Sequence, residues 1–420
     1  MLLRAESEAA VYVCPGERSP ISRGIHLGRM AGFYPACRTC RHRDDTGSLS
    51  ARQVKQLAET RRRSERAPLF HDEGAAGVFW NEIDPAVARR LGAALGIYLR
   101  HDRPPSAETA TVVIGADGRP PGTDMVAAAG EGLRWAGCRL VDVGKASAPC
   151  LAFAVDHLTA DGGLLVGNFA GQAHTVGLAF WEAAARPLSS GGSLEELRAI
   201  FDASPSRPTR RFGSTCRFSA EGAYLAGLAE RYHALRPLRL VLAAQSPPVF
   251  GYLQQLTAAV ACRVTPFSGG MTALGGSVVR QQAHFGALVD DDAERCRLVD
   301  DRGRPVSDER LLWVLARHRL DAQPGGVIVL EQECSPRLAD QIHRRGGRVV
   351  FAGGRRAEMH GAMQAHEALL GGGASGRIWH RSGAGHASPD ALWTLTLLFE
   401  LLSQSDRPLA DILDADAPVS

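Results

Sequence analysis

Asp290-Asp291-Asp292-Ala293-Glu294-Arg295 places four carboxylates within five positions, directly after the apolar run Gly286-Ala-Leu-Val289. Two like charges 4 Å apart repel each other by about 1 kcal/mol in water, and by more where water is excluded, so the stretch needs a neutralising group. Mg²⁺ prefers carboxylate oxygens, and alternate side chains of one loop can converge on a single ion. The stretch therefore predicts an Mg²⁺ site with Asp290, Asp292 and Glu294 as ligands. A solvated acidic turn after a strand is the alternative.

Outward from this loop, short apolar runs alternate with segments of helical periodicity, which is typical of α/β folds with buried, largely parallel strands flanked by helices. The expected strands are residues 111–114, 138–143, 238–243, 287–289, 327–330 and 348–351. The expected helices are residues 86–99, 125–135, 151–158, 223–235, 251–260, 337–345 and 389–402. Residues 204–219, rich in Pro and Arg, indicate a linker. The pattern predicts three consecutive α/β domains, over residues 75–205, 215–312 and 313–420, after a small Cys- and His-containing N-terminal module, residues 1–67.

The charge of the chain is unevenly distributed. Lys plus Arg number 48 and Asp plus Glu number 45, a formal charge of +3. Residues 1–67 hold 13 of the basic and 7 of the acidic side chains, a charge of +6, which leaves −3 for the rest. Apolar residues at 45% and charged residues at 22% are typical of a globular protein and exclude a disordered chain. Without a signal-peptide pattern or a run of about 18 apolar residues, we expect no membrane partner and a cytoplasmic location.

The N-terminal module shows no helical or strand periodicity over residues 12–42. It contains Cys37-Arg-Thr-Cys40, a spacing that suits two thiolate ligands of zinc. With Cys14 and His42, this pair makes a predicted structural Cys₃His zinc site, which would order a segment that has few apolar residues. His26 is a spare ligand, and unligated thiols are the alternative.

A basic helix is predicted in the same module. Ser50 and Gln53 have the spacing of a capping box, and Pro68 ends the helix. Arginines of the module, at positions 38, 41, 43, 61, 62, 63 and 66, could contact nucleic acid or another anionic partner. We interpret them instead as a solvated helix face, so no nucleic-acid partner is expected.

Taken with its surroundings, the acidic loop resembles the metal loop of the α-D-phosphohexomutases, the phosphoglucomutase and phosphomannomutase family, which reads Asp-Gly-Asp-x-Asp-Arg. Arg295 matches the family's Arg, and Glu294 stands at its third Asp. Gly115-Ala-Asp117-Gly-Arg119 resembles the family's Gly-x-Asp-x-Arg strand end. Gly144 to Pro149 resembles its Gly-x-x-x-Thr-Pro turn. Gly372-Gly-Ala-Ser-Gly-Arg377 aligns with its sugar loop Gly-Glu-x-Ser-Gly-His, and the order of these motifs over residues 78–415 is more specific than any one of them.

The resemblance implies three phosphohexomutase-type α/β domains and a role in carbohydrate metabolism. In the family a serine near Mg²⁺ carries the phosphoryl group that is exchanged between positions of a hexose phosphate. The aligned motifs imply that Arg119, Arg295, Ser375 and Arg377 contact such a substrate.

The family's nucleophile loop, Gly-Gly-Ile-Met-Val-Thr-Ala-Ser-His-Asn-Pro, has its counterpart in the stretch that begins at Gly162-Gly163. Phe169 stands at the position of the catalytic serine, and a phenyl ring has no atom that accepts a phosphoryl group. His174 is the substitute candidate. It lies five positions further on, and a displacement of even 1 Å can cost about a hundredfold in rate.

Family members continue into a fourth domain that holds the substrate phosphate, and we expect this domain to be absent here. The prediction is a catalytically inactive phosphohexomutase-like protein that binds a sugar phosphate or serves as a scaffold or regulatory subunit for a protein partner. Two alternatives stay open. One is an Mg²⁺-dependent phosphoglucomutase or phosphomannomutase that acts by a non-standard route, and the other is an interaction module whose zinc-bound head binds nucleic acid or protein.

Overall fold

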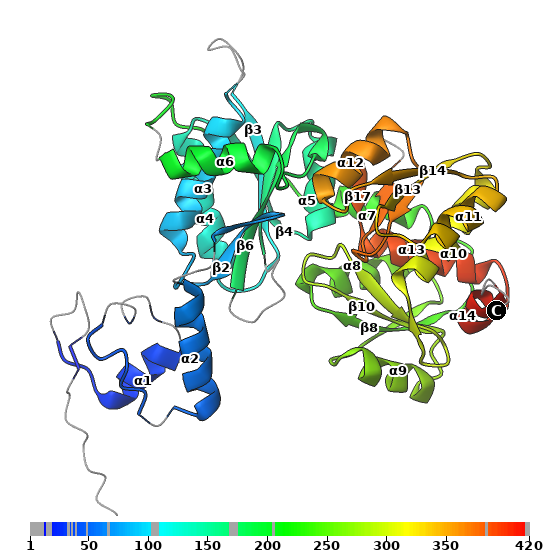
Figure 1. The fold of residues 1–420 in the computed structure, drawn as a ribbon, viewed down its shortest axis with the longest axis horizontal. Helices are drawn as coiled ribbons and strands as arrows, with labels where there is room; N and C mark the ends of the chain where they lie inside the picture. The colour runs from blue at the N-terminus through cyan, green and yellow to red at the C-terminus, as the bar shows by residue number, and fades with distance from the viewer. Residues whose placement is uncertain are drawn as a thin grey trace, which may run out of the picture.

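The computed structural model describes residues 12–13, 19–31, 34, 37, 40–47, 49–64, 68–101, 109–167, 175–203, 206–382 and 385–415. Three β-sheets with flanking helices follow one another along the chain, after two helices of the N-terminal module, α1 (Arg23–Ala31) and α2 (Ala51–Ser64) (Figure 1). The predicted mixed α/β class is therefore confirmed. Within these residues, no helix is both long and apolar enough to cross a membrane.

The first sheet has seven strands in the order β1-β2-β6-β5-β3-β4-β7. Its strands are β1 (Phe70–His71), β2 (Gly74–Val78), β3 (Thr111–Ala116), β4 (Arg139–Lys145), β5 (Gly162–Gly167), β6 (Thr175–Glu182) and β7 (Thr215–Arg217). Its helices are α3 (Pro85–Tyr98), α4 (Gly122–Trp135), α5 (Ala148–His157) and α6 (Ser193–Ala203). Strands β5, β3, β4 and β7 pair in parallel, whereas β6 pairs antiparallel with both β5 and β2.

The second and third sheets have five strands each, in the orders β12-β11-β10-β8-β9 and β14-β13-β15-β16-β17. The second contains β8 (Arg239–Ala244), β9 (Arg263–Pro266), β10 (Phe285–Val289), β11 (Cys296–Val299) and β12 (Pro305–Val306), with helices α7 (Ala220–Ala229), α8 (Pro247–Thr257) and α9 (Met271–Arg280). The third contains β13 (Val327–Glu331), β14 (Arg348–Ala352), β15 (Leu370–Gly372), β16 (Ile378–Arg381) and β17 (Ala387–Pro389). Its helices are α10 (Asp308–Ala322), α11 (Pro336–Arg344), α12 (Arg356–Ala365), α13 (Ala391–Ser403) and α14 (Leu409–Ala415).

Local sequence explains where the helices begin. The backbone N–H of Gln53 donates to Ser50 Oγ at 3.3 Å, and the backbone N–H of Ser50 donates to Gln53 Oε1 at 3.0 Å. This reciprocal pair confirms the predicted capping box of α2. Helix α3 begins in a similar way, because the Asp84 side chain accepts the backbone N–H of Val87 at 2.9 Å and Pro85 occupies the first turn.

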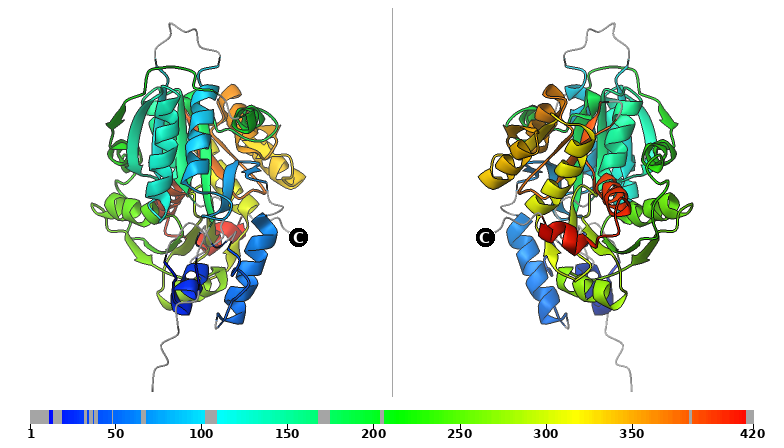
Figure 2. Two further views of the ribbon diagram at one scale, coloured as in Figure 1. Left: turned by 90° about the vertical axis from the view of Figure 1, so that its left-hand side faces the viewer. Right: turned by 90° about the vertical axis from the view of Figure 1, so that its right-hand side faces the viewer.

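One hydrophobic core runs through all three sheets. A single cluster of buried side chains includes Leu165 of β5, Leu242 and Phe285 of the second sheet, and Leu330 and Leu370 of the third. The N-terminal module lies away from this core: Figure 1 shows α1 and α2 below the first sheet, and α2 stays at the lower end in both views of Figure 2. The three sheets therefore pack as one body, with the basic module beside the first sheet.

Two expectations about irregular segments were wrong. Residues 12–42 contain α1, which buries His26, Leu27 and Met30. The predicted linker 204–219 contains β7, which pairs with β4 and so extends the first sheet. Strand β7 is three residues long and all three are exposed, so its sequence shows no alternation of apolar and polar positions.

The close contact between α3 and α4 gives a stability prediction. A Cβ atom at Gly92 would lie 2.1 Å from the carbonyl oxygen of Ala129. Because the obstacle is backbone, we expect Gly92→Ala to lower the free energy of unfolding by about 2–3 kcal/mol in urea titrations. Gly251 in α8 has open space around the same position. Gly251→Ala is the control and should raise the free energy of unfolding by about 0.5–1 kcal/mol. Equal effects of the two variants would contradict this packing.

Candidate functional site

The acidic loop connects β10 to β11, its antiparallel neighbour, at the carboxyl end of β10. Asp290 Oδ1 accepts the backbone N–H groups of Glu294 at 3.1 Å and Arg295 at 3.0 Å. Ala293 has a φ of +65°, a region that residues with a side chain rarely adopt. The loop is thus a tight turn closed by its own first carboxylate.

The backbone of the acidic loop also reaches helices of the other two units. The N–H of Ala148, at the start of α5, donates to the carbonyl oxygen of Asp292 at 3.2 Å. The N–H of Ala391, at the start of α13, donates to the carbonyl oxygen of Ala293 at 3.0 Å. The loop therefore lies at the junction of the three α/β units.

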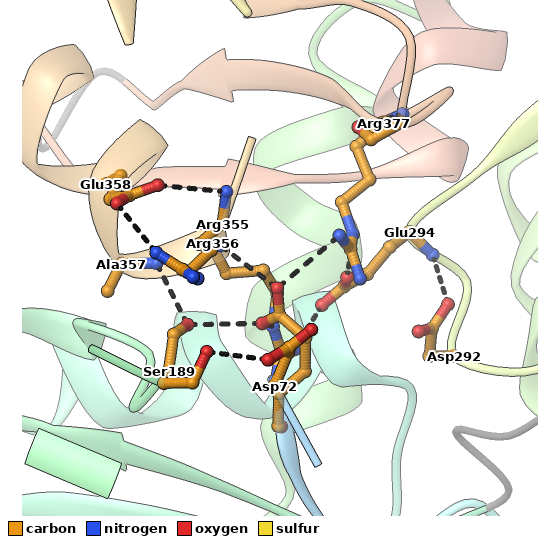
Figure 3. Close-up of polar contacts among 12 residues, drawn as sticks. Asp72, Ser189, Asp292, Glu294, Arg355, Arg356, Ala357, Glu358 and Arg377 are labelled. Carbon is orange, nitrogen blue, oxygen red and sulfur yellow. Dashed lines mark hydrogen bonds and ion pairs between the residues drawn. The ribbon is translucent and has the colours of Figure 1, made fainter. Parts of the chain in front are cut away.

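Four charged side chains, three of them buried, form a ring at this junction. Glu294 Oε1 accepts a hydrogen bond from Arg356 Nη1, and Glu294 Oε2 accepts one from Arg377 Nε, both at 2.7 Å. Arg356 also binds Glu73, through Nε to Oε2 at 2.7 Å and through its backbone N–H to Oε1 at 3.2 Å. Arg377 Nη1 lies 3.8 Å from Glu73 Oε1, which closes the ring. Figure 3 shows Arg356 and Arg377 converging on Glu294. We call Glu73, Glu294, Arg356 and Arg377 the arginine–glutamate ring.

Three members of the ring are buried, the Glu73 side chain is 25% exposed, and the four charges balance. Arg356 is 2% exposed and Glu294 is 3% exposed. Burial alone would lower the pKa of Arg356, but the carboxylates of Glu294 and Glu73 raise it above its ordinary value, so the guanidinium stays charged. The same guanidinium lies 5.4 Å from the centre of the Trp181 ring, in a cation–π arrangement. Two carboxylates and two guanidinium groups thus compensate each other in a water-poor site.

The loop's remaining carboxylates also contact arginines. Arg119, after β3, donates to Asp117 and to Asp291 of the acidic loop. Arg295 Nη1 donates to Asp290 Oδ2 at 3.1 Å. Burial, and next the charge of neighbouring Asp292, raise the pKa of Asp290 well above its ordinary value.

The predicted sugar loop lies directly beside the acidic loop. Arg295 Nε donates to the backbone oxygen of Ser375 at 2.8 Å, and Arg295 and Arg377 form an antiparallel β-bridge. The Ser375 hydroxyl and backbone N–H both donate to the buried carboxylate of Glu331. The structure therefore brings together the four residues expected to contact substrate, but engages the polar side chains of all four with internal partners.

The predicted metal ligands form no recognisable metal centre. Among the residues that the structure describes, no group of three or more His, Cys, Asp or Glu side chains is arranged to hold a metal ion. Asp290, Asp292 and Glu294 share one loop as expected, but Glu294 is directed toward Arg356 and Arg377.

The predicted nucleophile region is framed by β5 and β6. Gly162 and Gly163 lie in β5, and Gly177 of β6 pairs with Gly167, so the aligned glycines belong to one antiparallel pair. Phe169 and His174 lie between these strands in the sequence and fall outside the described residues.

The zinc site of the N-terminal module stays a prediction, because Cys14 falls outside the described residues. Cys40 Sγ accepts the backbone N–H of His42 at 3.4 Å. His42 Nε2 accepts a hydrogen bond from Arg41 Nε at 3.0 Å. In this arrangement Nδ1 is the ring nitrogen that would bind the predicted zinc ion.

Sequence reasoning missed two members of the ring, Glu73 and Arg356. Glu73 follows the two-residue strand β1, and Arg356 follows Gly353-Gly354 at the start of α12. They are 283 positions apart. No periodic or spacing signal connects residues at that separation.

Comparisons with known proteins agree with this architecture. Residues 67–168 match the family model "Phosphoglucomutase/phosphomannomutase, alpha/beta/alpha domain I", and residues 307–419 match the model of domain III of the same family. The chain is 29% identical over 369 residues to "Phosphohexose mutases" of Xanthomonas campestris pv. campestris, covering 83% of this chain and 80% of the relative. It is 25% identical over 364 residues to a phosphomannomutase of Escherichia coli, covering 80% and 77%.

Solved structures share the fold. A phosphoglucomutase/phosphomannomutase family protein of Burkholderia thailandensis superposes with a TM-score of 0.73 at 23% identity, covering 82% of this chain and 78% of the other. A putative phosphomannomutase of Thermus thermophilus gives a TM-score of 0.71 at 21% identity, covering 83% of both chains.

Proposed function

This chain belongs to the α-D-phosphohexomutase (phosphoglucomutase/phosphomannomutase) family. We propose that it is a non-catalytic member of this family that serves as a scaffold or regulatory protein of carbohydrate metabolism. Its reaction centre has lost the group that carries phosphate, while the scaffold of three α/β units is retained.

The observation that carries the proposal is the composition of residues 168–174, which connect β5 and β6. They read Asn-Phe-Ala-Gly-Gln-Ala-His, without a serine, threonine or cysteine. Phe169 stands at the aligned position of the phosphoryl-carrying serine. Covalent phosphoryl transfer needs a nucleophile with a lone pair to donate, which a phenyl ring lacks. His174, the substitute candidate, lies five positions from the aligned position, and a displacement of even 1 Å can cost about a hundredfold in rate.

The predicted substrate contacts support the same function. Arg377 is paired with Glu294, and Arg295 with Asp290 and Ser375, so these donors would have to leave their internal partners before they could bind a hexose phosphate.

A coupled mutase assay tests the proposal. Purified protein with Mg²⁺, glucose 1-phosphate and glucose 1,6-bisphosphate should give no turnover above a metal-free blank, at least about 10³-fold below a family member that has the serine motif. Phe169→Ser should stay inactive as well, because Glu294 remains bound to two arginines. Turnover by the unmodified chain, with either glucose or mannose phosphates, would sink the proposal. Calorimetric binding of glucose 1-phosphate below about 1 mM, without turnover, would redirect it to a sugar-phosphate-binding role.

A further inference from the structure

The acidic loop of this protein is neutralised by side chains from all three α/β units. We propose that the guanidinium groups of Arg356 and Arg377 take the place of a divalent cation at the loop, and that the arginine–glutamate ring holds the three units together without any metal.

The loop's oxygens do not fit an Mg²⁺ site. Mg²⁺ demands near-octahedral geometry, with oxygens about 2.0–2.1 Å from the ion and free to turn toward it. Both side-chain oxygens of Glu294 are held by guanidinium groups at 2.7 Å. Asp290 Oδ1 accepts two backbone N–H groups, and its Oδ2 accepts Arg295 Nη1. Two of the three aligned ligands would have to break these contacts before they could bind an ion.

Asp292 alone does not restore the site. Its Oδ1 accepts the backbone N–H of Glu294 at 3.2 Å, and its Oδ2 lies 3.9 Å from Arg295 Nη1. A metal drawn to Asp292 would therefore sit near a fixed positive charge. One carboxylate in such a position does not supply the charge that a divalent ion needs.

The ring also does the structural work that a shared ion could do. Glu73 comes from the turn between β1 and β2, Glu294 from the turn between β10 and β11, and Arg356 and Arg377 from α12 and the segment before β16. Each of the three units thus contributes at least one charge. Two outer contacts extend the junction: Ser189 Oγ donates to Glu73 at 3.2 Å and accepts the N–H of Ala357 at 3.1 Å (Figure 3).

Because Glu294, Arg356 and Arg377 are buried, loss of a partner leaves an uncompensated charge away from water. An incoming cation that displaced Arg356 from Glu294 would leave that guanidinium 2% exposed with Glu73 as its remaining carboxylate. The guanidinium groups of Arg356 and Arg377 belong to the chain itself, so they compete with a metal ion for Glu294 at every metal concentration. The buried position of Arg356 and this constant competition favour the arginines over free Mg²⁺.

Mn²⁺ binding followed by electron paramagnetic resonance tests the proposal on the full-length chain. Wild type should show no stoichiometric site at the loop with a Kd below about 1 mM. The double variant Arg356→Gln/Arg377→Gln frees both oxygens of Glu294 and should bind Mn²⁺ at least tenfold more tightly. The matched control is Arg355→Gln, which alters the neighbouring exposed Arg355–Glu358 pair and should bind as wild type does.

Stoichiometric Mn²⁺ binding by wild type that Asp292→Asn abolishes would overturn the proposal. So would a folded double variant that binds Mn²⁺ no better than wild type. If the double variant does not fold, the wild-type titration with its Asp292→Asn comparison still decides. These readouts are independent of the mutase assay: turnover without metal would remove only the proposed function, whereas Mn²⁺ binding without turnover would remove only this inference.

Discussion

Replacing Arg356 with methionine is expected to lower the free energy of unfolding by about 3–5 kcal/mol, the usual cost of breaking a buried ion pair. Methionine keeps much of the apolar stem, but it leaves Glu294, which is 3% exposed, with Arg377 as its remaining guanidinium partner in the ring. Glu73 also loses its 2.7 Å contact with the Arg356 guanidinium. Urea unfolding followed by fluorescence measures the change, with Trp181 under the Arg356 guanidinium as a local reporter.

The adjacent Arg355 provides the matched control. It is exposed and pairs with Glu358 at 3.3 Å, so Arg355→Met should change the free energy of unfolding by less than about 1 kcal/mol. Neutralising the whole ring, with Gln at both glutamates and Met at both arginines, should recover most of the lost stability, because no unpaired charge is then buried. An Arg356→Met variant as stable as the Arg355→Met control would contradict the role of the ring.

Acidification between pH 6.5 and 4 is expected to remove about 3 kcal/mol of stability for each of two buried histidines. His360 and His386 are 4% and 5% exposed, and their ring centroids are 6.5 Å apart. Burial lowers the pKa of His360 to about 4 and the pKa of His386 to about 3, from an ordinary value near 6.5. At pH values below 6.5 and above these lowered pKa values, the two histidines bind protons in the unfolded chain but not in the folded chain. The stabilisation is therefore present above pH 6.5 and is lost as the pH falls.

Asp390 works in the opposite direction over part of this range. Burial raises its pKa to about 6, although hydrogen bonds from Trp393 and Tyr224 lower it. The folded chain therefore takes up this proton before the unfolded chain does, so Asp390 favours folding as the pH falls from 6 to 4. This contribution offsets only part of the loss from the two histidines.

Comparison of variants separates the contribution of His386 to the pH dependence of stability from that of Asp390. His386→Leu should reduce the stability lost between pH 6.5 and 4 by about 3 kcal/mol, measured by urea unfolding at a series of pH values. It should also keep the stability at pH 8, because neither ring nitrogen of His386 has a hydrogen-bond partner among the described residues. His366→Gln, at an exposed position, should leave the profile unchanged. An unaltered profile in His386→Leu would contradict the buried, neutral state of this histidine.

The elements that the sequence predicted well are those whose signal is local. Residues 327–330 form β13 and residues 86–99 form α3 within one or two positions, because apolar runs and caps act over a few neighbouring residues. Strands β15 and β17, of three residues each, were missed because so short a segment carries no period. The replacement of the aligned serine by Phe169 needed no structure at all, since it is visible from residue types.

For the acidic loop, the sequence by itself determined that four carboxylates follow a buried strand and that something must neutralise them. It suggested a metal, because the four carboxylates are close together in the sequence, whereas the arginines that compensate them are far away in it. Only the tertiary structure decided the partner: Arg356 lies 62 positions beyond Glu294, and Glu73 lies 283 positions before Arg356. Packing of three α/β units around one core brings these side chains to hydrogen-bonding distance, and buried charges are compensated by whichever groups the fold places beside them.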